Sequence, residues 1–134
     1  MPKAAAKPHV LLVEADTLLA DLYGGALAND FNVSLAKDAQ TAIDRMDDGN
    51  VAVLVTDVLV GRHDGVEIIQ EVRSHDDWLR LPIIILSSLA ADDFPLPTSR
   101  WESYGIRRVL YKPTTKPDHL AAAVRQVLGL PSKP

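Results

Sequence analysis

The sequence predicts an α/β domain in which a parallel sheet is covered by helices on both faces. Short apolar runs rich in β-branched residues, such as VAVLVTD (51–57) and LPIIILSS (81–88), are typical of strands buried on both faces. These strand-like runs alternate with segments whose apolar residues recur at helical spacing. Polar residues directly follow several of the strand-like runs. Five strands alternating with about five helical stretches indicate a doubly wound fold.

The first third of the chain predicts a strand, a helix and a second strand. HVLLV (9–13) has the pattern of a buried strand. Residues 15–30 are expected to form a helix in which Gly24 and Gly25 each cost about 1 kcal/mol relative to alanine, so that its end is weak or kinked. FNVSLA (31–36) alternates apolar and polar residues, as an edge strand does. The apolar stripe of the helix is expected to contain Leu18, Leu19, Leu22, Tyr23, Ala26 and Leu27.

The middle of the chain predicts two further helices and two further strands. Asp38 is suited to cap a helix that ends at DDGN (47–50), just before the strand at 51–57. A Gly-bearing loop leads into the next helix. The strand at 81–88 has proline near its start, where proline is tolerated. The helix after the loop is marked by Val66, Ile69 and Val72.

The last third contains the least regular segment. The two prolines of FPLP (94–97) remove backbone donors, so we expect a short helix directly after them and no long one. RRVLY (107–111) is the fifth predicted strand. Thr115 and Asp118 have the spacing of a capping box for a final helix. The apolar stripe of that helix is expected to contain Leu120, Ala123, Val124, Val127 and Leu128.

Length and composition limit the classes of function. The 134 residues suffice for one domain with its own core, for which we expect boundaries at 9–129, a flexible arm at 1–8 and a tail at 130–134. A net charge of −4 argues against a nucleic-acid surface. No apolar run reaches the roughly 18 residues of a membrane span. With no cysteine, disulfides and thiol chemistry are excluded, and we expect a cytoplasmic protein without nucleic-acid or membrane partners.

The side chains able to do chemistry are expected at the carboxyl ends of the strands, where ligands bind in doubly wound sheets. Glu14 and Asp16 follow the first strand, Asp57 ends the third, Ser87 ends the fourth and Lys112 follows the fifth. Carboxylates about 4 Å apart repel by roughly 4 kcal/mol at intermediate dielectric, so an amine or a hard cation such as Mg²⁺ must offset them. Such a site suits phosphoryl chemistry, with a carboxylate that forms an acyl phosphate.

Four motifs in order resemble the receiver domain of two-component response regulators. They are VLLVEAD (10–16), VTDVLVGRHDG (55–65), PIIILSS (82–88) and YKP (111–113), at near-usual spacings. The resemblance covers roughly residues 9–129. It implies a flavodoxin-like receiver fold, a doubly wound five-stranded parallel sheet with the strand order 2-1-3-4-5.

By position, the resemblance implies that Asp57 is the phosphoacceptor for a sensor histidine kinase or a phosphotransfer protein. Ser87 and Lys112 would bind the phosphoryl group. Glu14, Asp57 and the backbone carbonyl of Leu59 would bind Mg²⁺. Other matching positions are Asp64, as a cap of the third helix, and Pro113, which follows the lysine, often through a cis bond.

The sequence also departs from the receiver pattern. Ala15 stands where receivers carry a second adjacent acid, so Mg²⁺ is expected to bind weakly. Asp16 lies one position late, which makes it a doubtful metal ligand and a better cap for the first helix. Gly61 replaces a common proline, and Val109 replaces the usual aromatic signalling residue.

Three functions are open at this stage. The first is a single-domain receiver that is phosphorylated on Asp57, has at most slow self-dephosphorylation, is not otherwise an enzyme, and signals by binding a downstream protein. The second is a phosphorylation-independent pseudo-receiver acting as a protein-binding module, which Ala15 and Val109 favour. The third is a small aspartyl phosphatase or phosphotransferase, which would need a second acid where Leu59 stands.

Overall fold

The computed structural model describes residues 6–60, 63–94 and 97–132. None of the helices in these residues has the length and apolar character needed to cross a membrane. The strands are β1 (His9–Val13), β2 (Asn32–Ala36), β3 (Val51–Thr56), β4 (Leu59–Val60), β5 (His63–Asp64), β6 (Ile83–Ser87) and β7 (Ile106–Tyr111). The α-helices are α1 (Thr17–Leu27), α2 (Ala39–Asp48), α3 (Gly65–Arg73) and α4 (Pro117–Val127). Short 3₁₀ turns are η1 (Asp76–Trp78), η2 (Ala91–Asp93), η3 (Thr98–Arg100) and η4 (Lys112–Thr114).

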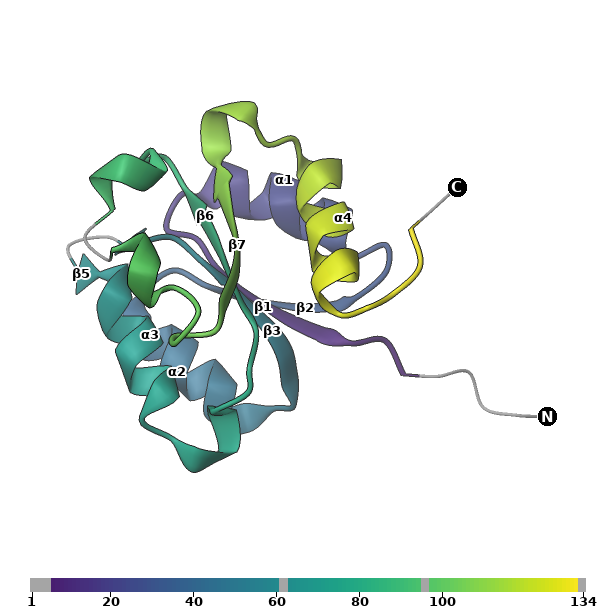
Figure 1. Ribbon diagram of the computed structural model, residues 1–134. Coiled ribbons are helices and arrows are strands. Elements are labelled where there is room, and N and C mark those ends of the chain that lie inside the picture. Colours follow the sequence, from purple (N-terminus) through teal and green to yellow (C-terminus); the bar gives the residue numbers. More distant parts are fainter. Residues whose placement is uncertain (1–5, 61–62, 95–96, 133–134) are drawn as a thin grey trace.

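A parallel sheet forms the centre of the molecule, with the strand order β2-β1-β3-β6-β7. Counting these five strands along the chain gives the order 2-1-3-4-5, so the predicted fold class is confirmed. Helices α1 and α4 cover one face of the sheet and α2 and α3 cover the other (Figure 1). The strand β2 lies at one edge, as its alternating pattern predicted. The short strands β4 and β5 pair as a separate antiparallel hairpin after β3.

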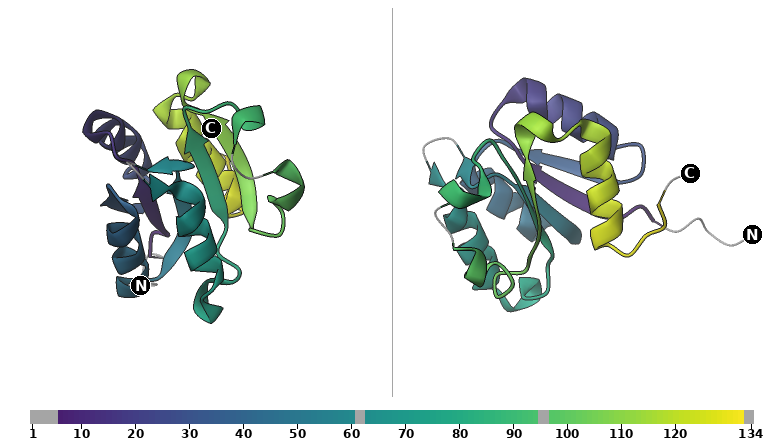
Figure 2. Two further views of the ribbon diagram at one scale, coloured as in Figure 1. Left: turned by 90° about the vertical axis from the view of Figure 1, so that its left-hand side faces the viewer. Right: turned by 45° about the horizontal axis from the view of Figure 1, so that its top comes forward.

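The continuous apolar runs follow from burial of the sheet on both faces (Figure 2). In β3, Leu54 joins the core beneath α2 and α3, whereas Val53 and Val55 join the core beneath α1 and α4. All three side chains are fully buried. Because successive strand residues point to opposite faces, a strand with a core on each side needs an apolar residue at every position.

Of the four predicted helix caps, those at Asp16 and Asp38 are present. The carboxylate of Asp16 accepts a hydrogen bond from Leu19 N at 3.0 Å, and that of Asp38 accepts one from Thr41 N at 2.7 Å. The capping box at Thr115 is wrong. Helix α4 starts one residue later than that box requires, with Pro117 in its first turn, and proline has no backbone N–H to cap.

Helix α1 is continuous through both of its glycines, so they do not break it, and its predicted weakness stays a prediction. The predicted apolar stripe is partly wrong, since Leu18 is 67% exposed and Leu22 is 50% exposed. Two small residues share the buried face of the helix with two large ones, and a Cβ at Gly24 would lie 3.3 Å from Leu35 Cδ2 of β2. Leu18 and Leu22 lie off this buried face. The buried residues of α1 are Ala20, Tyr23, Gly24 and Leu27.

Between β6 and β7 the described residues form two 3₁₀ turns and no α-helix, so only four of the five expected helices are found in the described part of the chain. The short turn η3 directly follows the proline-bearing segment, as predicted, while Pro95 and Leu96 lie outside the described residues. The Phe94 and Trp101 rings contact each other with centroids 5.6 Å apart and pack against the core beneath α2 and α3. These aromatic residues cover apolar surface that a helix would otherwise bury.

Candidate functional site

Asp57 directly follows β3, the middle strand of the sheet, and is only 5% exposed. The strand register determines its neighbours. Val13 pairs with Thr56, so Glu14 and Asp57 emerge side by side from β1 and β3. Thr56 also pairs with Ile85, which places the end of β6 beside them. The carboxyl ends of three adjacent strands thus bring their polar side chains to one edge, as the sequence predicted.

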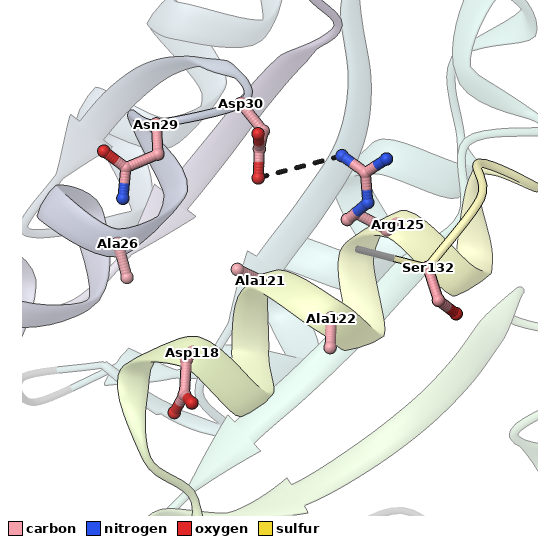
Figure 3. A pocket seen from close by; sticks show the side chains of 8 residues that line it. All are labelled: Ala26, Asn29, Asp30, Asp118, Ala121, Ala122, Arg125 and Ser132. Carbon is pink, nitrogen blue, oxygen red and sulfur yellow. Dashed lines mark ion pairs between the residues drawn. The ribbon is translucent and has the colours of Figure 1, made fainter. Parts of the chain in front are cut away.

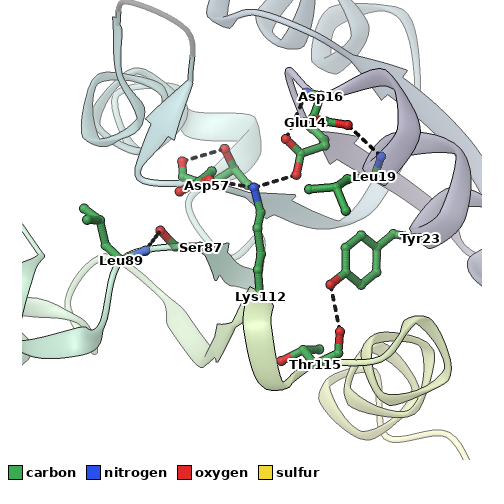
Figure 4. A network of polar contacts seen from close by, with 10 residues as sticks. Glu14, Asp16, Leu19, Tyr23, Asp57, Ser87, Leu89, Lys112 and Thr115 are labelled. Atoms are coloured by element: carbon green, nitrogen blue, oxygen red, sulfur yellow. Dashed lines mark hydrogen bonds and ion pairs between the residues drawn. The ribbon is translucent and has the colours of Figure 1, made fainter.

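Lys112 connects the two acids. Its Nζ lies 2.8 Å from Asp57 Oδ2 and 2.6 Å from Glu14 Oε1 (Figure 4). Lys112 follows β7, whose last residue, Tyr111, pairs with Ser87 of β6. The amine must therefore reach over the end of β6 to meet acids on the two strands beyond it. The sequence predicted that Asp57 and Lys112 lie at the same edge of the sheet, and the 2.8 Å contact between them confirms it.

The three charges explain how an apolar strand can end in a nearly buried carboxylate. Two carboxylates and one ammonium group leave one net negative charge, and each carboxylate side chain is 6% exposed. An unpaired charge at such a position would be costly, but a paired and hydrogen-bonded one is tolerated. Burial by itself lowers the pKa of Lys112, but the hydrogen bonds and charges of Asp57 and Glu14 outweigh burial and raise that pKa above its ordinary value.

Asp16 does not join this cluster. Its carboxylate turns to Leu19 N as the cap of α1, while its own backbone N–H donates to Glu14 Oε2 at 3.2 Å. Ala15, between them, is exposed and offers no carboxylate. Helix capping, which the sequence favoured for Asp16, is confirmed, and its carboxylate is not directed at Asp57. Asp16 nevertheless orients Glu14 through its backbone.

Ser87 ends β6 and is fully buried, at the same edge as Asp57. Its Oγ accepts a hydrogen bond from Leu89 N at 3.1 Å (Figure 4). The hydroxyl thus holds the start of the β6–β7 connection. Its predicted role toward a phosphoryl group stays a prediction.

The remaining predicted positions are only partly described. Leu59 opens β4 two residues after Asp57, and its carbonyl as a metal ligand stays a prediction. Asp64 closes β5 just before α3, with its side chain outside the description, and Gly61 lies outside the described residues. The described residues contain no cis peptide bond, so the bond before Pro113 is trans, contrary to the pattern common in the family.

Tyr23 is a polar neighbour of the site that the sequence did not single out. Its hydroxyl donates to the backbone carbonyl of Thr115 at 2.7 Å, and its side chain lies to the right of Lys112 in Figure 4. Burial raises the pKa of Tyr23 above its ordinary value. The positive charge of Lys112 lowers this pKa, and the negative charge of Glu14 raises it further, but burial is the largest effect. The sequence placed Tyr23 on the apolar stripe, and a buried tyrosine needs a hydrogen-bond partner. The sequence could therefore have predicted that the Tyr23 hydroxyl has a hydrogen-bond partner. It could not have predicted which one, because Thr115 lies 92 positions away.

Two carboxylates of the site are of the kind that holds Mg²⁺, and its predicted weak binding stays a prediction. Mg²⁺ commonly takes one or two protein carboxylates and fills its remaining positions with water and phosphate oxygens. Glu14 and Asp57 supply two carboxylates. In the part of the chain that the structure describes, no group of three or more acids and histidines is placed to hold a metal. The donor set is therefore one acid short of the receiver pattern, at Ala15.

Comparisons with known proteins agree on one family. The family model described as "Response regulator receiver domain" matches residues 10–125. The response regulator MprA of Mycobacterium avium is 30% identical over 130 residues, covering 87% of this chain and 56% of the relative. The chain spans about half the length of the curated relatives it matches first, between 53% and 56%.

Solved structures show the same fold. The chemotaxis response regulator CheY4 of Vibrio cholerae matches with a TM-score of 0.79 at 20% identity, over 91% of this chain and 99% of that one. A sensor protein from Polaromonas sp. JS666 matches with a TM-score of 0.80 at 21% identity, over 91% and 96% of the two chains. Proteins of this family are generally signalling modules rather than enzymes. With the sheet order, the acidic edge and the family match in agreement, the chain belongs to the response regulator receiver domain family.

Proposed function

We propose that this receiver domain accepts a phosphoryl group on Asp57 and signals through protein–protein binding. The phosphodonor is the phosphohistidine of a sensor histidine kinase or of a phosphotransfer protein, and the setting is cytoplasmic. The observation that supports this most directly is the 2.8 Å contact between Lys112 Nζ and Asp57 Oδ2 at the end of the middle strand. The proposed domain comprises residues 9–129, with an arm before it and a tail after it.

In the proposed reaction, a carboxylate oxygen of Asp57 attacks the phosphorus of the donor. An O–P bond forms as the P–N bond to the donor imidazole breaks, and the electron pair stays on the imidazole nitrogen. Lys112 holds the Asp57 carboxylate in place and, as a cation at the same edge, can pair with the transferred oxygens. Slow attack of water on the acyl phosphate would return the carboxylate and inorganic phosphate, so the domain resets itself without acting as an enzyme on another substrate.

Two side chains support the acceptor from the neighbouring strands. Glu14 shares the amine of Lys112 and adds negative charge beside Asp57. We assign Ser87 to a phosphoryl oxygen, because its buried hydroxyl lies at the end of the adjacent strand. Glu14, Asp57 and the Leu59 carbonyl would hold Mg²⁺, which when bound neutralises charge that develops on the phosphoryl oxygens.

The proposal is tested by incubating the protein with acetyl phosphate and Mg²⁺ and measuring its intact mass. We expect the mass to rise by one phosphoryl group. The variant Asp57→Asn should show no gain, because an amide cannot form the acyl phosphate. The control Asp77→Asn removes an exposed acid from η1 and should gain the group as the parent does. No gain in the parent protein, or an equal gain in Asp57→Asn, would overturn the proposal.

A further inference from the structure

Tyr23 joins the two segments that carry the partners of Asp57. Helix α1 begins shortly after Glu14, and the turn η4 begins with Lys112. The hydroxyl of Tyr23, on α1, donates to the carbonyl of Thr115 at the end of that turn, at 2.7 Å. Tyr23 is 3% exposed, and its ring is part of the core beneath α1 and α4. One partly buried hydrogen bond therefore connects the helix that follows Glu14 to the turn that presents Lys112.

The turn that presents Lys112 is tied together by its own hydrogen bonds. Thr115 N donates to the carbonyl of Lys112 at 3.1 Å. Thr115 Oγ1 and Thr114 Oγ1 donate to the carbonyl of Tyr111, at 2.8 and 3.2 Å. Because these bonds make residues 111–115 a compact unit, a constraint on Thr115 is passed to the backbone of Lys112.

The turn therefore needs an anchor outside itself. The Lys112 side chain must span from β7 across the end of β6 to acids on β3 and β1, and a shift of its backbone would move Nζ away from them. Misplacement of a charged group by about 1 Å can cost as much as 100-fold in rate. In Figure 4 the Tyr23 hydroxyl meets the Thr115 carbonyl to the right of Lys112.

We infer that Tyr23 is a positioning residue for Lys112 and thereby for phosphoryl capture at Asp57. It touches neither the acceptor nor the phosphoryl group and acts through the turn at residues 111–115. The rate effect rests on the proposed function, whereas the placement of Lys112 can be measured without it.

The first measurement is the initial rate of phosphorylation by acetyl phosphate at saturating Mg²⁺, under conditions where every variant is folded. Tyr23→Phe keeps the ring and removes only the hydroxyl, and we expect its rate to fall about fivefold. Thr115→Val removes the hydroxyl that ties the turn to Tyr111, so its rate should fall in the same direction. A purely structural role would lower the stability of either variant and leave the rate of the folded protein unchanged.

Arg125→Met is the matched control. Arg125 lies in the last turn of α4, where it makes a 3.7 Å ion pair with Asp30, which follows α1, and donates to the Pro131 carbonyl at 2.8 Å (Figure 3). This variant also removes a link between α4 and the residues that follow α1, but near the C-terminal ends of the two helices. Its phosphorylation rate should stay within about twofold of the parent rate.

The second measurement is NMR of the lysine ammonium groups in the unphosphorylated protein. The Lys112 ammonium, held by two carboxylates, should be ordered in the parent and in Arg125→Met and less ordered in Tyr23→Phe. Unchanged order and an unchanged rate in Tyr23→Phe would overturn the inference, as would equal losses in Arg125→Met. If the parent takes up no phosphoryl group, the proposed function fails, and the ammonium signal alone then decides the role of Tyr23.

Discussion

Lys112 determines the character of the site at the residue scale. Its amine contacts both Glu14 and Asp57, whose side chains are each only 6% exposed. Removing one partner from such a cluster leaves uncompensated charge, which is the costly case. The sequence predicted that an amine or a cation must offset the acids. It did not predict that the amine would contact both acids, because that depends on a side chain spanning three strands.

The pH dependence of stability should report the Lys112 pairing. The pKa of Lys112 is raised in the folded protein, so its stabilising contribution is fully present below the ordinary lysine value of about 10.4 and is lost as pH rises through the higher folded value. Urea unfolding of the parent and of Lys112→Met should differ by a constant amount at neutral pH and converge at high pH. Lys116→Met, at an exposed lysine, should show no such convergence, and a constant gap for Lys112→Met across that range would contradict the pairing.

Ala15 explains the expected weakness of metal binding. Restoring an acid with Ala15→Asp adds a carboxylate next to Glu14, and we expect Mg²⁺ affinity to rise about tenfold. Fluorescence of the two tryptophans during a Mg²⁺ titration measures it. Thr17→Asp adds the same charge two residues later, at the start of α1, and serves as the control. An equal rise of Mg²⁺ affinity in both variants would mean that the added negative charge, and not its position at residue 15, raises the affinity.

At the scale of elements, the β6–β7 connection departs most from the predicted pattern. The guanidinium of Arg73, the last residue of α3, donates to the Tyr104 carbonyl at 2.6 Å, to the Trp78 carbonyl at 2.5 Å and to the Leu81 carbonyl. This side chain holds the end of the connection where an α-helix is absent from the described residues. Proline content predicted that no long helix would form, but such long-range contacts leave no pattern in the sequence.

The β6–β7 connection also depends on a glycine at position 105. Its φ is +74°, and a Cβ at this position would lie 2.0 Å from the Arg73 guanidinium. We expect Gly105→Ala to lower the free energy of unfolding by about 2 kcal/mol or more, because it combines backbone strain with a clash. Urea unfolding checks this. Gly25→Ala is the control, since its Cβ would meet nothing within 4 Å in α1, and it should stabilise the protein by about 1 kcal/mol.

Helix α1 shows why an apolar stripe is an incomplete guide. Leu18 and Leu22 are exposed, whereas the buried face of the helix includes Gly24, where a Cβ would lie 3.3 Å from a Leu35 side-chain carbon of β2. Hydrophobicity alone ranks leucine above glycine for the core. Here a glycine occupies a buried position beside the Leu35 side chain, while two leucines face outward.

For the whole molecule, most of the architecture followed from pattern. Alternation of buried strands and amphipathic segments predicted a doubly wound sheet, and the rule that ligands bind beyond the strand ends predicted where Glu14, Asp57 and Lys112 would meet. The strand order came from the resemblance to receivers. Contacts between distant segments, such as Tyr23 with Thr115, required the structure. Neither the described geometry nor the comparisons favour the phosphorylation-independent alternative.

The central claim is that Asp57 itself becomes the acyl phosphate, held beside Lys112. The most direct measurement is to phosphorylate the protein with acetyl phosphate and Mg²⁺, reduce it with sodium borohydride, and sequence its peptides by mass spectrometry. Borohydride converts an aspartyl phosphate to homoserine, so we expect homoserine at position 57 alone. Unreduced aspartate at position 57, with homoserine at another acid or nowhere in the chain, would contradict the claim.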